Sequence, residues 1–182
     1  MLKGQRVGLR YVTADDLPWL KRTVSDPQVR GPFLGSRMTT PHAIEQRWKD
    51  NGFANEDAER LMICLLSDGS VIGDVVHFAA ARYTTAREIG WTLADVALRG
   101  QGLTTEAAAL LVDYLFDNWP VNRLSCGMSI HNHASRRVAE KCGFRHEGIQ
   151  RGIVFVAGEY VDCHALGLLR SDWAAAKGRA AE

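Results

Sequence analysis

The sequence lacks the patterns that mark disulfide-rich, zinc-binding and membrane proteins. It has four cysteines, which are far apart and form no C-x-x-C pair: Cys64, Cys126, Cys142 and Cys163. This spacing argues against a disulfide framework or a zinc site, and reduced thiols indicate the cytoplasm. No apolar stretch approaches the length of a membrane span, and no apolar run long enough for a signal sequence follows Met1 to Arg6. We therefore expect a cytoplasmic protein that does not associate with membranes.

An excess of charge of one sign is also absent. The chain has 22 Lys and Arg residues against 21 Asp and Glu residues, a net charge of +1. The chain therefore has no overall electrostatic field that would attract nucleic acid. Any charged partner must be recognised by a local group of side chains. His131 and His133 could place two imidazoles together, but no third ligand is nearby in sequence, so we expect no metal.

The length of 182 residues suits one domain with a substantial core. The sequence shows no repeats and no low-complexity segments. We expect a single domain over residues 1–175, followed by a small, polar, frayed tail over residues 176–182.

A strand, a glycine-containing turn and a helix follow one another near the middle of the chain. A short strand is predicted over residues 88–93 and a helix from near Thr105, with Gly100 and Gly102 between them. Glycines let a ligand approach the backbone, and the first turn of a helix carries unpaired amides and about half a positive charge. A pyrophosphate would fit there. For Gly-x-Gly alone, however, a plain connecting turn is the commoner case.

Periodicity predicts the other elements. Thr13 with Asp16, and Thr40 with Pro41, are typical helix starts. The helix from Thr105 has its apolar stripe at Ala107, Leu110, Leu111, Tyr114 and Leu115. Strands are predicted over residues 6–11, 61–66, 71–78, 88–93, 124–130, 153–156 and 160–169, and helices from near residues 13, 40, 105, 132 and 171. This order indicates an α/β fold around a mixed sheet.

Several spaced motifs resemble those of one enzyme family. Residues 99–104 are similar to the Q/R-x-x-G-x-G/A acyl-CoA motif of the GCN5-related N-acetyltransferase (GNAT) superfamily, although Thr104 stands where Gly or Ala is usual. Residues 132–144 resemble the second CoA-side motif, N-x-x-S through G-F. Residues 147–173 resemble the tail of the RimJ/RimL-like branch, the ribosomal-protein-alanine acetyltransferases.

The resemblance implies the GNAT fold, a central mixed and mostly antiparallel β-sheet that is flanked by helices and splayed at the acyl-CoA site. It also implies acetyl-CoA as co-substrate and direct transfer of acetyl to a primary amine, either a protein N-terminal α-amine or a small amine such as an antibiotic or amino acid. The pantetheine arm would pair with strand backbone inside the splay. The implied cofactor-binding residues are Trp91, Thr92, Leu93, Arg99, Gly100, Gln101, Gly102, Leu103, Thr104, Thr105, Asn132 and Ser135.

The catalytic candidates are one base and one acid, with a second choice for the base. Glu88 lies at the mouth of the strand predicted to hold the thioester, but it could equally be a surface carboxylate paired with Arg87. His77 is the second candidate base, and its alternative is a satisfied core histidine. The usual acid Tyr of the second motif is replaced by Ala139, so by resemblance Ser135 is the candidate acid; its alternative role is a helix cap.

The residues that bind the acceptor amine are the ones that the sequence determines least. By resemblance, Phe33, Arg37, Trp48 and Tyr83 are candidate substrate contacts, although Trp48 could be plain core. A thiol on a cleft strand, Cys126, could in principle carry an acyl group, but it has no adjacent base. Two further alternatives are a non-catalytic acyl-CoA sensor on the same fold and, at the level of the family, a homodimer.

Overall fold

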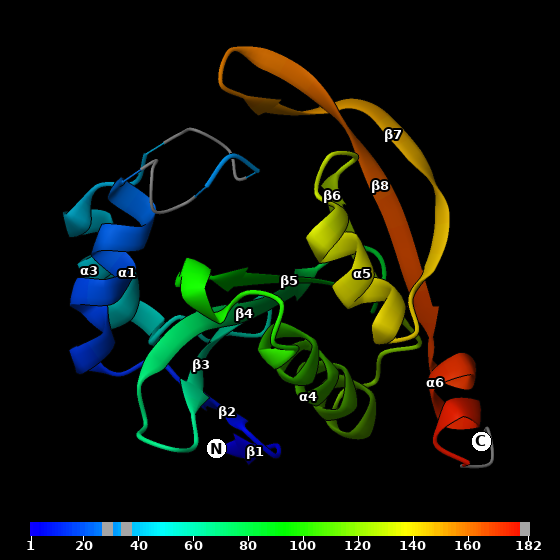
Figure 1. Ribbon diagram of the computed structural model, residues 1–182, viewed down its shortest axis with the longest axis horizontal. Coiled ribbons are helices and arrows are strands. Elements are labelled where there is room, and N and C mark those ends of the chain that lie inside the picture. Colours follow the sequence, from blue (N-terminus) through cyan, green and yellow to red (C-terminus); the bar gives the residue numbers. More distant parts are fainter. Residues whose placement is uncertain (27–30, 34–37, 179–182) are drawn as a thin grey trace.

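The computed structural model describes residues 1–26, 31–33 and 38–178 (Figure 1). Its strands are β1 (Leu2–Lys3), β2 (Val7–Tyr11), β3 (Ala58–Leu65), β4 (Val71–Ala79), β5 (Arg87–Leu93), β6 (Arg123–Ser129), β7 (Arg145–Val156) and β8 (Glu159–Leu169). Its helices are α1 (Leu17–Ser25), α3 (Pro41–Asn51), α4 (Leu103–Asn118), α5 (His133–Lys141) and α6 (Arg170–Ala176), with short 3-10 turns η1 (Ala14–Asp16) and η2 (Val96–Leu98).

One eight-stranded sheet runs through the molecule in the order β1-β2-β3-β4-β5-β6-β8-β7. Every neighbouring pair is antiparallel except β5 with β6, which is parallel. The prediction of a mixed, mostly antiparallel sheet is therefore confirmed. The hairpin of β7 and β8 extends beyond the rest of the molecule, at the top of Figure 1.

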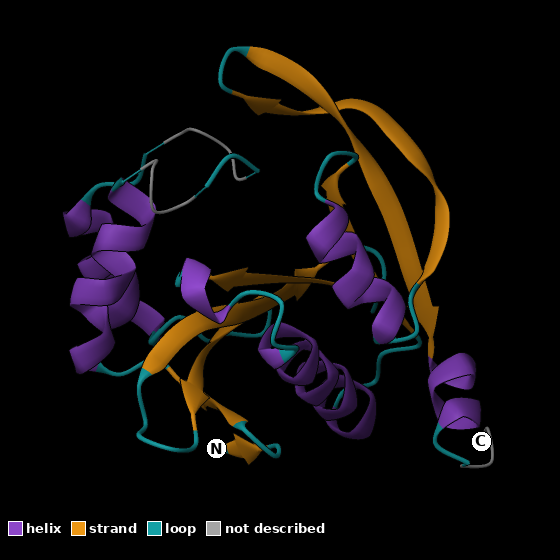
Figure 2. Cartoon of the chain, viewed as in Figure 1, coloured by secondary structure: helices purple, strands orange, loops and turns teal. Residues whose placement is uncertain are grey.

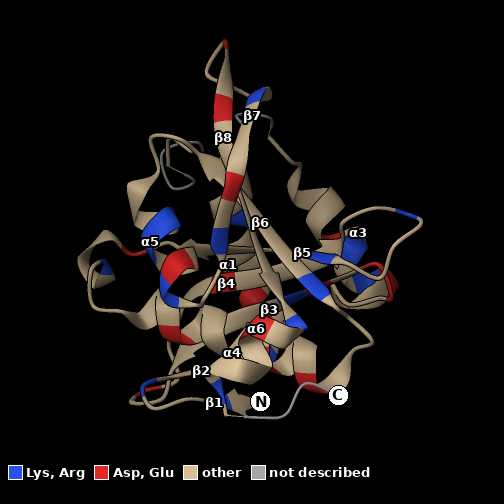
Figure 3. Ribbon diagram, turned by 90° about the vertical axis from the view of Figure 1, so that its right-hand side faces the viewer, with Lys and Arg blue, Asp and Glu red and all other residues tan. Residues whose placement is uncertain are grey.

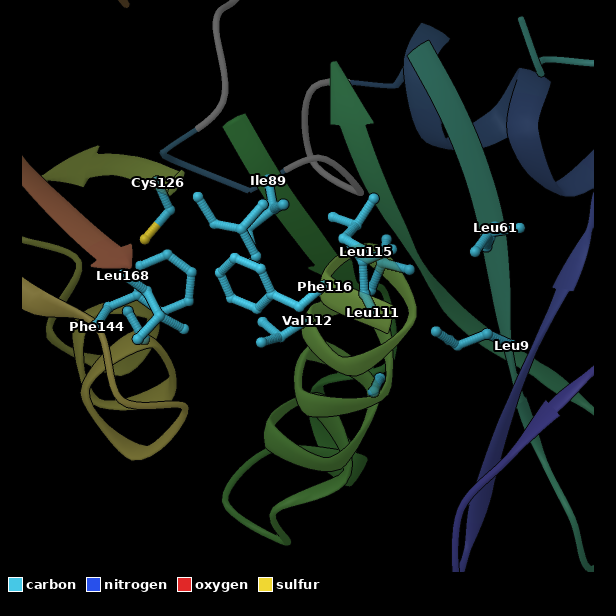
Figure 4. Packing of buried hydrophobic residues seen from close by; sticks show 14 of the residues in the cluster. Leu9, Leu61, Ile89, Leu111, Val112, Leu115, Phe116, Cys126, Phe144 and Leu168 are labelled. Carbon is cyan, nitrogen blue, oxygen red and sulfur yellow. The ribbon is translucent and has the colours of Figure 1, made fainter. Parts of the chain in front are cut away.

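Helices lie on both faces of the sheet (Figure 2). Each face has its own apolar cluster. Leu61 and Ile63 pack with α4, whereas their neighbour Met62 packs with α1 and α3. Successive strand residues point to opposite faces, so this alternation assigns each residue of β3 and β5, and of β4 from Gly73 onward, to one side. Figure 4 shows Phe116 of α4 lying against Ile89 of β5 in the first cluster.

The predicted N-terminal helix starts are confirmed. The amide of Thr13 donates to Asp16 at 2.8 Å, and the hydroxyl of Thr40 accepts from the amide of Ala43 at 3.2 Å. In both cases a side chain pairs a backbone amide at the point where the helical hydrogen bonds begin.

The central helix differs in detail from its prediction. It begins at Leu103 rather than near Thr105, because Gly102 takes a left-handed conformation with φ of 81° and serves as the cap. Leu110 and Tyr114 are only half-buried, and the buried stripe instead includes Ala108, Val112 and Phe116. A helix in contact with both the sheet and α5 buries more than one stripe.

Two further differences lie at the chain ends. β1 was not predicted, because two residues give no periodic pattern. The last helix begins at Arg170, one residue before the predicted cap Ser171. Arg170 donates to the carbonyls of Val121 and Trp119 at 2.9 and 2.8 Å, beyond the C-terminal end of α4. Of the predicted frayed tail, residues 179–182 lie outside the described part of the chain.

Candidate active site

The two central strands separate after a short stretch of pairing. β5 and β6 pair only at Arg87 with Leu124 and at Glu88 with Ser125. β5 then continues to Leu93 and β6 to Ser129, with no further pairing between them in the described chain. The backbone of β5 beyond Glu88 therefore faces a gap on this side, and an extended, amide-containing ligand could complete the ladder there.

The three predicted pantetheine contacts lie along this unpaired stretch. Trp91 and Leu93 are half-buried and pack against the α4-side cluster. Thr92 points to the other face, where it is paired in register with Asp74 of β4. The side chains of these three residues point to different faces, whereas their backbone groups follow one another along the gap. We therefore expect them to bind pantetheine through their backbone amides and carbonyls.

The glycine turn presents a row of unpaired backbone donors. Gly100 and Gly102 have φ of 77° and 81°, a region that favours glycine. None of the amides from Gly100 to Thr105 donates a hydrogen bond to another residue in the described ranges; the first helical bond is from Glu106 to the Gly102 carbonyl. Such consecutive donors at a helix N-terminus form an anion site.

The side chains of this turn contribute less than the resemblance implied. The Gln101 amide group donates to the Ala97 carbonyl at 3.1 Å, which turns it back toward η2. The Leu103 side chain is buried in the core, so only its amide can meet a ligand. Arg6 and Glu106 also contact the turn. The sequence analysis missed them, and no local motif could have linked positions a hundred residues apart.

Glu88 occupies the point where the strands part. Its Oε1 lies 3.9 Å from where a Cβ would stand on Gly127 of β6, so the carboxylate reaches across the mouth of the gap. Burial raises the pKa of Glu88 above its ordinary value. The alternative that Glu88 pairs with Arg87 is wrong: that guanidinium donates to the Asp57 carbonyl at 2.8 Å and lies over Trp119. No ion pair involves Glu88 in the described part of the chain.

Asn132 and Ser135 lie at the start of α5, and the helix cap is Asn132 rather than Ser135. Asn132 is the helix cap, because its Oδ1 accepts from the amide of Ser135 at 3.1 Å. The alternative role of Ser135 as a cap is therefore wrong. Ser135 is half-buried within the first turn, and its amide is fixed by Asn132. Ala139, which replaces the usual Tyr, is completely buried.

His77 does not face the gap, so the expectation that it could act as a second base is wrong. Its side chain has 0% exposure and lies on the α4 face of β4. Nε2 is 3.0 Å from Oε2 of Glu59, and the ring packs edge-on against Trp119. A substrate amine cannot reach an imidazole enclosed in this way. Nδ1 has no hydrogen-bond partner in the described chain, so the core histidine is only partly satisfied.

The acceptor candidates are scattered rather than convergent. Trp48 packs against the α1–α3 cluster and is half-buried, which fits the core alternative. Phe33 is 40% exposed, and Tyr83, in the turn between β4 and β5, is 90% exposed. Arg37 lies outside the described residues. The structure thus gathers the cofactor candidates around one gap but does not assemble the four acceptor candidates.

Cys126, the thiol on the strand β6, is free and buried. Burial raises the pKa of Cys126 to about 12, with the charge of Glu88 as a second cause. A thiol that stays protonated is a poor nucleophile. Across the described ranges, no three His, Cys, Asp or Glu side chains gather as a metal site would require. No helix within those same ranges has the length and apolar character needed to cross a membrane.

Comparison with known proteins identifies the family. Residues 6–145 match the family model described as an acetyltransferase (GNAT) domain. The chain belongs to the GNAT acetyltransferase family. The family prediction made from the motifs is confirmed, and so is the fold.

Two Bacillus subtilis relatives share part of their sequence with this GNAT member. It is 39% identical over 107 residues to the probable N-acetyltransferase YjcK and 32% identical over 109 residues to the putative ribosomal N-acetyltransferase YdaF. These matches cover 58% and 60% of this chain and 59% of each relative. The chain therefore matches about three fifths of the length of these relatives.

A solved structure shares the fold over almost the whole chain. Spermidine N-acetyltransferase from Vibrio cholerae, in complex with CoA and spermine, superimposes with a TM-score of 0.82 at 16% identity. The match covers 93% of this chain and 99% of that one. At this identity the likeness concerns the fold alone.

Proposed function

We propose that this chain is an acetyl-CoA-dependent N-acetyltransferase that passes acetyl directly to a primary amine. The observation that carries the proposal is Glu88, an unpaired carboxylate of raised pKa at the point where β5 and β6 separate. A base there can take a proton from an amine that meets a thioester held in the gap. The matching family model and the similarity to proteins named N-acetyltransferases support the same activity.

Each part of the site would have a separate task. Acetyl-CoA supplies an activated acetyl group. The amides of residues 100–105 would bind its diphosphate, and the backbone of Trp91 to Leu93 would hold the pantetheine arm. Glu88 points to the α1–α3 face and Ser135 belongs to α5 on the opposite face, so base and acid would approach the gap from two sides. The buried, protonated thiol of Cys126 supports direct transfer without an acyl-enzyme.

A protein or peptide α-amine is the acceptor we favour. Three carboxylates on the α1–α3 side are already paired with cations: Asp16 with Arg10, Glu45 with Lys21 and Asp74 with Arg60. These three are therefore not free to serve as counter-charges for a polyamine. Figure 3 likewise shows Lys and Arg residues interspersed with Asp and Glu residues over the elements in view. The similarity to a putative ribosomal N-acetyltransferase supports the RimJ/RimL-like branch.

Calorimetric binding of acetyl-CoA tests the cofactor site. Gly102→Trp should abolish binding, because a side chain is strained at a φ of 81° and its Cβ would lie 3.3 Å from Nη2 of Arg6, so the turn that presents the amides would have to shift. Gly69→Trp is the matched control, since Gly69 has a φ of 77° in the distant β3–β4 turn with no atom within 4 Å of an added Cβ. Wild-type protein that fails to bind acetyl-CoA would refute the proposal. Equal binding by both variants would refute the placement of the diphosphate.

Turnover against a panel of amines separates an enzyme from a non-catalytic acyl-CoA sensor. The panel should hold an alanine-terminated peptide, a free amino acid, an aminoglycoside and a polyamine. Binding of acetyl-CoA without turnover of any amine would favour the sensor. A cytoplasmic location, the absence of nucleic-acid and membrane partners and a homodimer stay predictions, and sedimentation tests the last.

A further inference from the structure

The glycine turn is held from behind by a pair of side chains that no acyl-CoA motif includes. Arg6 precedes β2, and Glu106 lies in the first turn of α4. Nη1 of Arg6 donates to the Gln101 carbonyl at 2.8 Å, and Nε donates to Oε2 of Glu106 at 3.2 Å. Nη2 lies 3.3 Å from where a Cβ would stand on Gly102. One guanidinium thus contacts the carbonyl, the carboxylate and the cap of the helix.

Glu106 fixes Arg6 in this place. Its Oε1 accepts from the amides of Gln5, Arg6 and Val7 at 2.6, 2.7 and 3.2 Å. Gly4 is required beside it, because a Cβ there would lie 2.4 Å from Oε1. The N-terminal turn therefore wraps around a single carboxylate of α4, which brings residue 6 to the glycine turn.

The contact to the Gln101 carbonyl sets the direction of a neighbouring amide. A trans peptide is planar, and its C=O and N–H point in opposite directions. The N–H of Gly102 belongs to the same peptide as the carbonyl of Gln101. Because Arg6 holds that carbonyl on its own side, the Gly102 N–H points away from Arg6, toward the open side of the turn.

Arg6 also compensates the charge of Glu106. Burial raises the pKa of Glu106, but the three amides and Arg6 lower it by more, so the carboxylate is ionised at neutral pH. A bare carboxylate in the first turn would offset the positive end of the helix dipole and repel a bound anion. The guanidinium lies between that charge and the turn.

We propose that Arg6 is a positioning residue for the diphosphate end of the acyl-CoA: it aims the Gly102 amide and screens Glu106. The inference rests on the proposed function, because it assumes that the amides of residues 100–105 bind the diphosphate. The inference goes beyond the proposed function because it assigns part of the cofactor site to the N-terminal segment, outside both acyl-CoA motifs.

The test compares two acyl donors that share the thioester and the pantetheine arm and differ in the 3′-phosphoadenosine diphosphate part. Acetyl-CoA carries the diphosphate, whereas S-acetylpantetheine has the same thioester and pantetheine arm without it. Arg6→Ala should raise the KM for acetyl-CoA about tenfold, the equivalent of one charge-assisted hydrogen bond, with little change in kcat. The KM and kcat for S-acetylpantetheine should stay at their wild-type values. Arg6→Lys keeps the charge but loses one contact, so its KM for acetyl-CoA should lie in between.

Arg123→Ala is the matched control, because it removes the exposed Arg123–Glu147 ion pair far along the sheet from the turn. It should leave both donors unaffected. An equal loss with both donors would mean that Arg6 only supports the fold, and no loss with either would also overturn the inference. Should Arg6→Ala fail to fold, the same comparison with Arg6→Lys decides. If wild-type KM is the same for both donors while Glu88→Gln still removes activity, the diphosphate assignment and this inference fail but the catalytic proposal stands.

Discussion

Gly127 offers a direct test of Glu88, because a side chain at this position would touch its carboxylate. A Cβ on Gly127 would lie 3.9 Å from Oε1 of Glu88 and 3.8 Å from the carbonyl of His164. Both distances are ordinary van der Waals contacts, and Gly127 lies within the regular strand β6. Gly127→Ala and Gly127→Ser should therefore fold, and both should act on Glu88.

The two substitutions should move the pKa of Glu88 in opposite directions. Burial alone already raises this pKa. The methyl group of Gly127→Ala removes more water from the carboxylate and should raise the pKa further, by about half a unit. The hydroxyl of Gly127→Ser can donate to the carboxylate. A hydrogen bond to a charged group contributes about 1.5 kcal/mol, so this pKa should fall by about one unit.

The assay is the pH dependence of kcat/KM for the amine at saturating acetyl-CoA, between about pH 4 and pH 9. A base works only when deprotonated, so activity is lost as the pH falls through the pKa of Glu88. The acidic limb should therefore shift to higher pH in Gly127→Ala and to lower pH in Gly127→Ser. The ionisation of the amine is the same in all three proteins and cancels in the comparison. Limbs that stay in place, or that move in the same direction, would refute Glu88 as the base.

Four further predictions concern single side chains. Glu88→Gln should lower kcat about a hundredfold and leave calorimetric binding of acetyl-CoA unchanged. Glu59→Gln should lower the free energy of unfolding by about 2 kcal/mol at neutral pH. Urea denaturation should show this difference shrinking in acid, because hydrogen bonds from His77 and the neighbouring tyrosines outweigh burial and lower the pKa of Glu59. Phe116→Ala, which empties a fully buried site, should cost about 4 kcal/mol in the same measurement. Asn132→Ala removes the cap of α5 and should cost about 1 kcal/mol.

Each of these has an outcome that contradicts it; for Asn132→Ala it is an unchanged free energy of unfolding. A kcat of Glu88→Gln equal to that of the wild type would show that the carboxylate takes no part in the reaction. The sign for Glu59 follows from its lowered pKa: the stability due to its charge is present above the pKa of the unfolded chain and is lost as the pH falls through the lower, folded value. A difference from wild type that grows in acid would show that the carboxylate is destabilised by burial. Losses below about 1 kcal/mol at Phe116 would mean that α4 does not close the core as described.

Local patterns predicted the fold well where the deciding forces are local. The helix starts at Thr13 and Thr40 each depend on a few adjacent residues, and both are observed. The glycine turn was located for the same reason. The helix after it was placed two residues late, because the left-handed cap at Gly102 cannot be told in sequence from the turn that precedes it.

The alternation of side chains along a strand could not show which face of the sheet would be the core and which would border the site. In β4, His77 and Asp74 lie on opposite faces, yet both are nearly inaccessible, at 0% and 2% exposure. Helices cover both sides, so neither face has the polar pattern of a solvent-exposed strand. That is why His77 was a plausible base in sequence and is a core residue in the structure. Arg6 was missed for a different reason, since its contacts with Gln101 and Glu106 join residues 95 and 100 positions apart.

The place where strand pairing stops determines which side chain can serve as the base. Three residues of β5 point to the α1–α3 face: Glu88, Gly90 and Thr92. Gly90 has no side chain, and Thr92 lies in register with Asp74, whose carboxylate is buried and paired with Arg60. Glu88 is the last residue of β5 paired with β6, so its backbone is held by both neighbours while its carboxylate opens onto the gap. Fixed geometry and an unpaired, partly buried charge coincide at this one position, and a proton acceptor needs both.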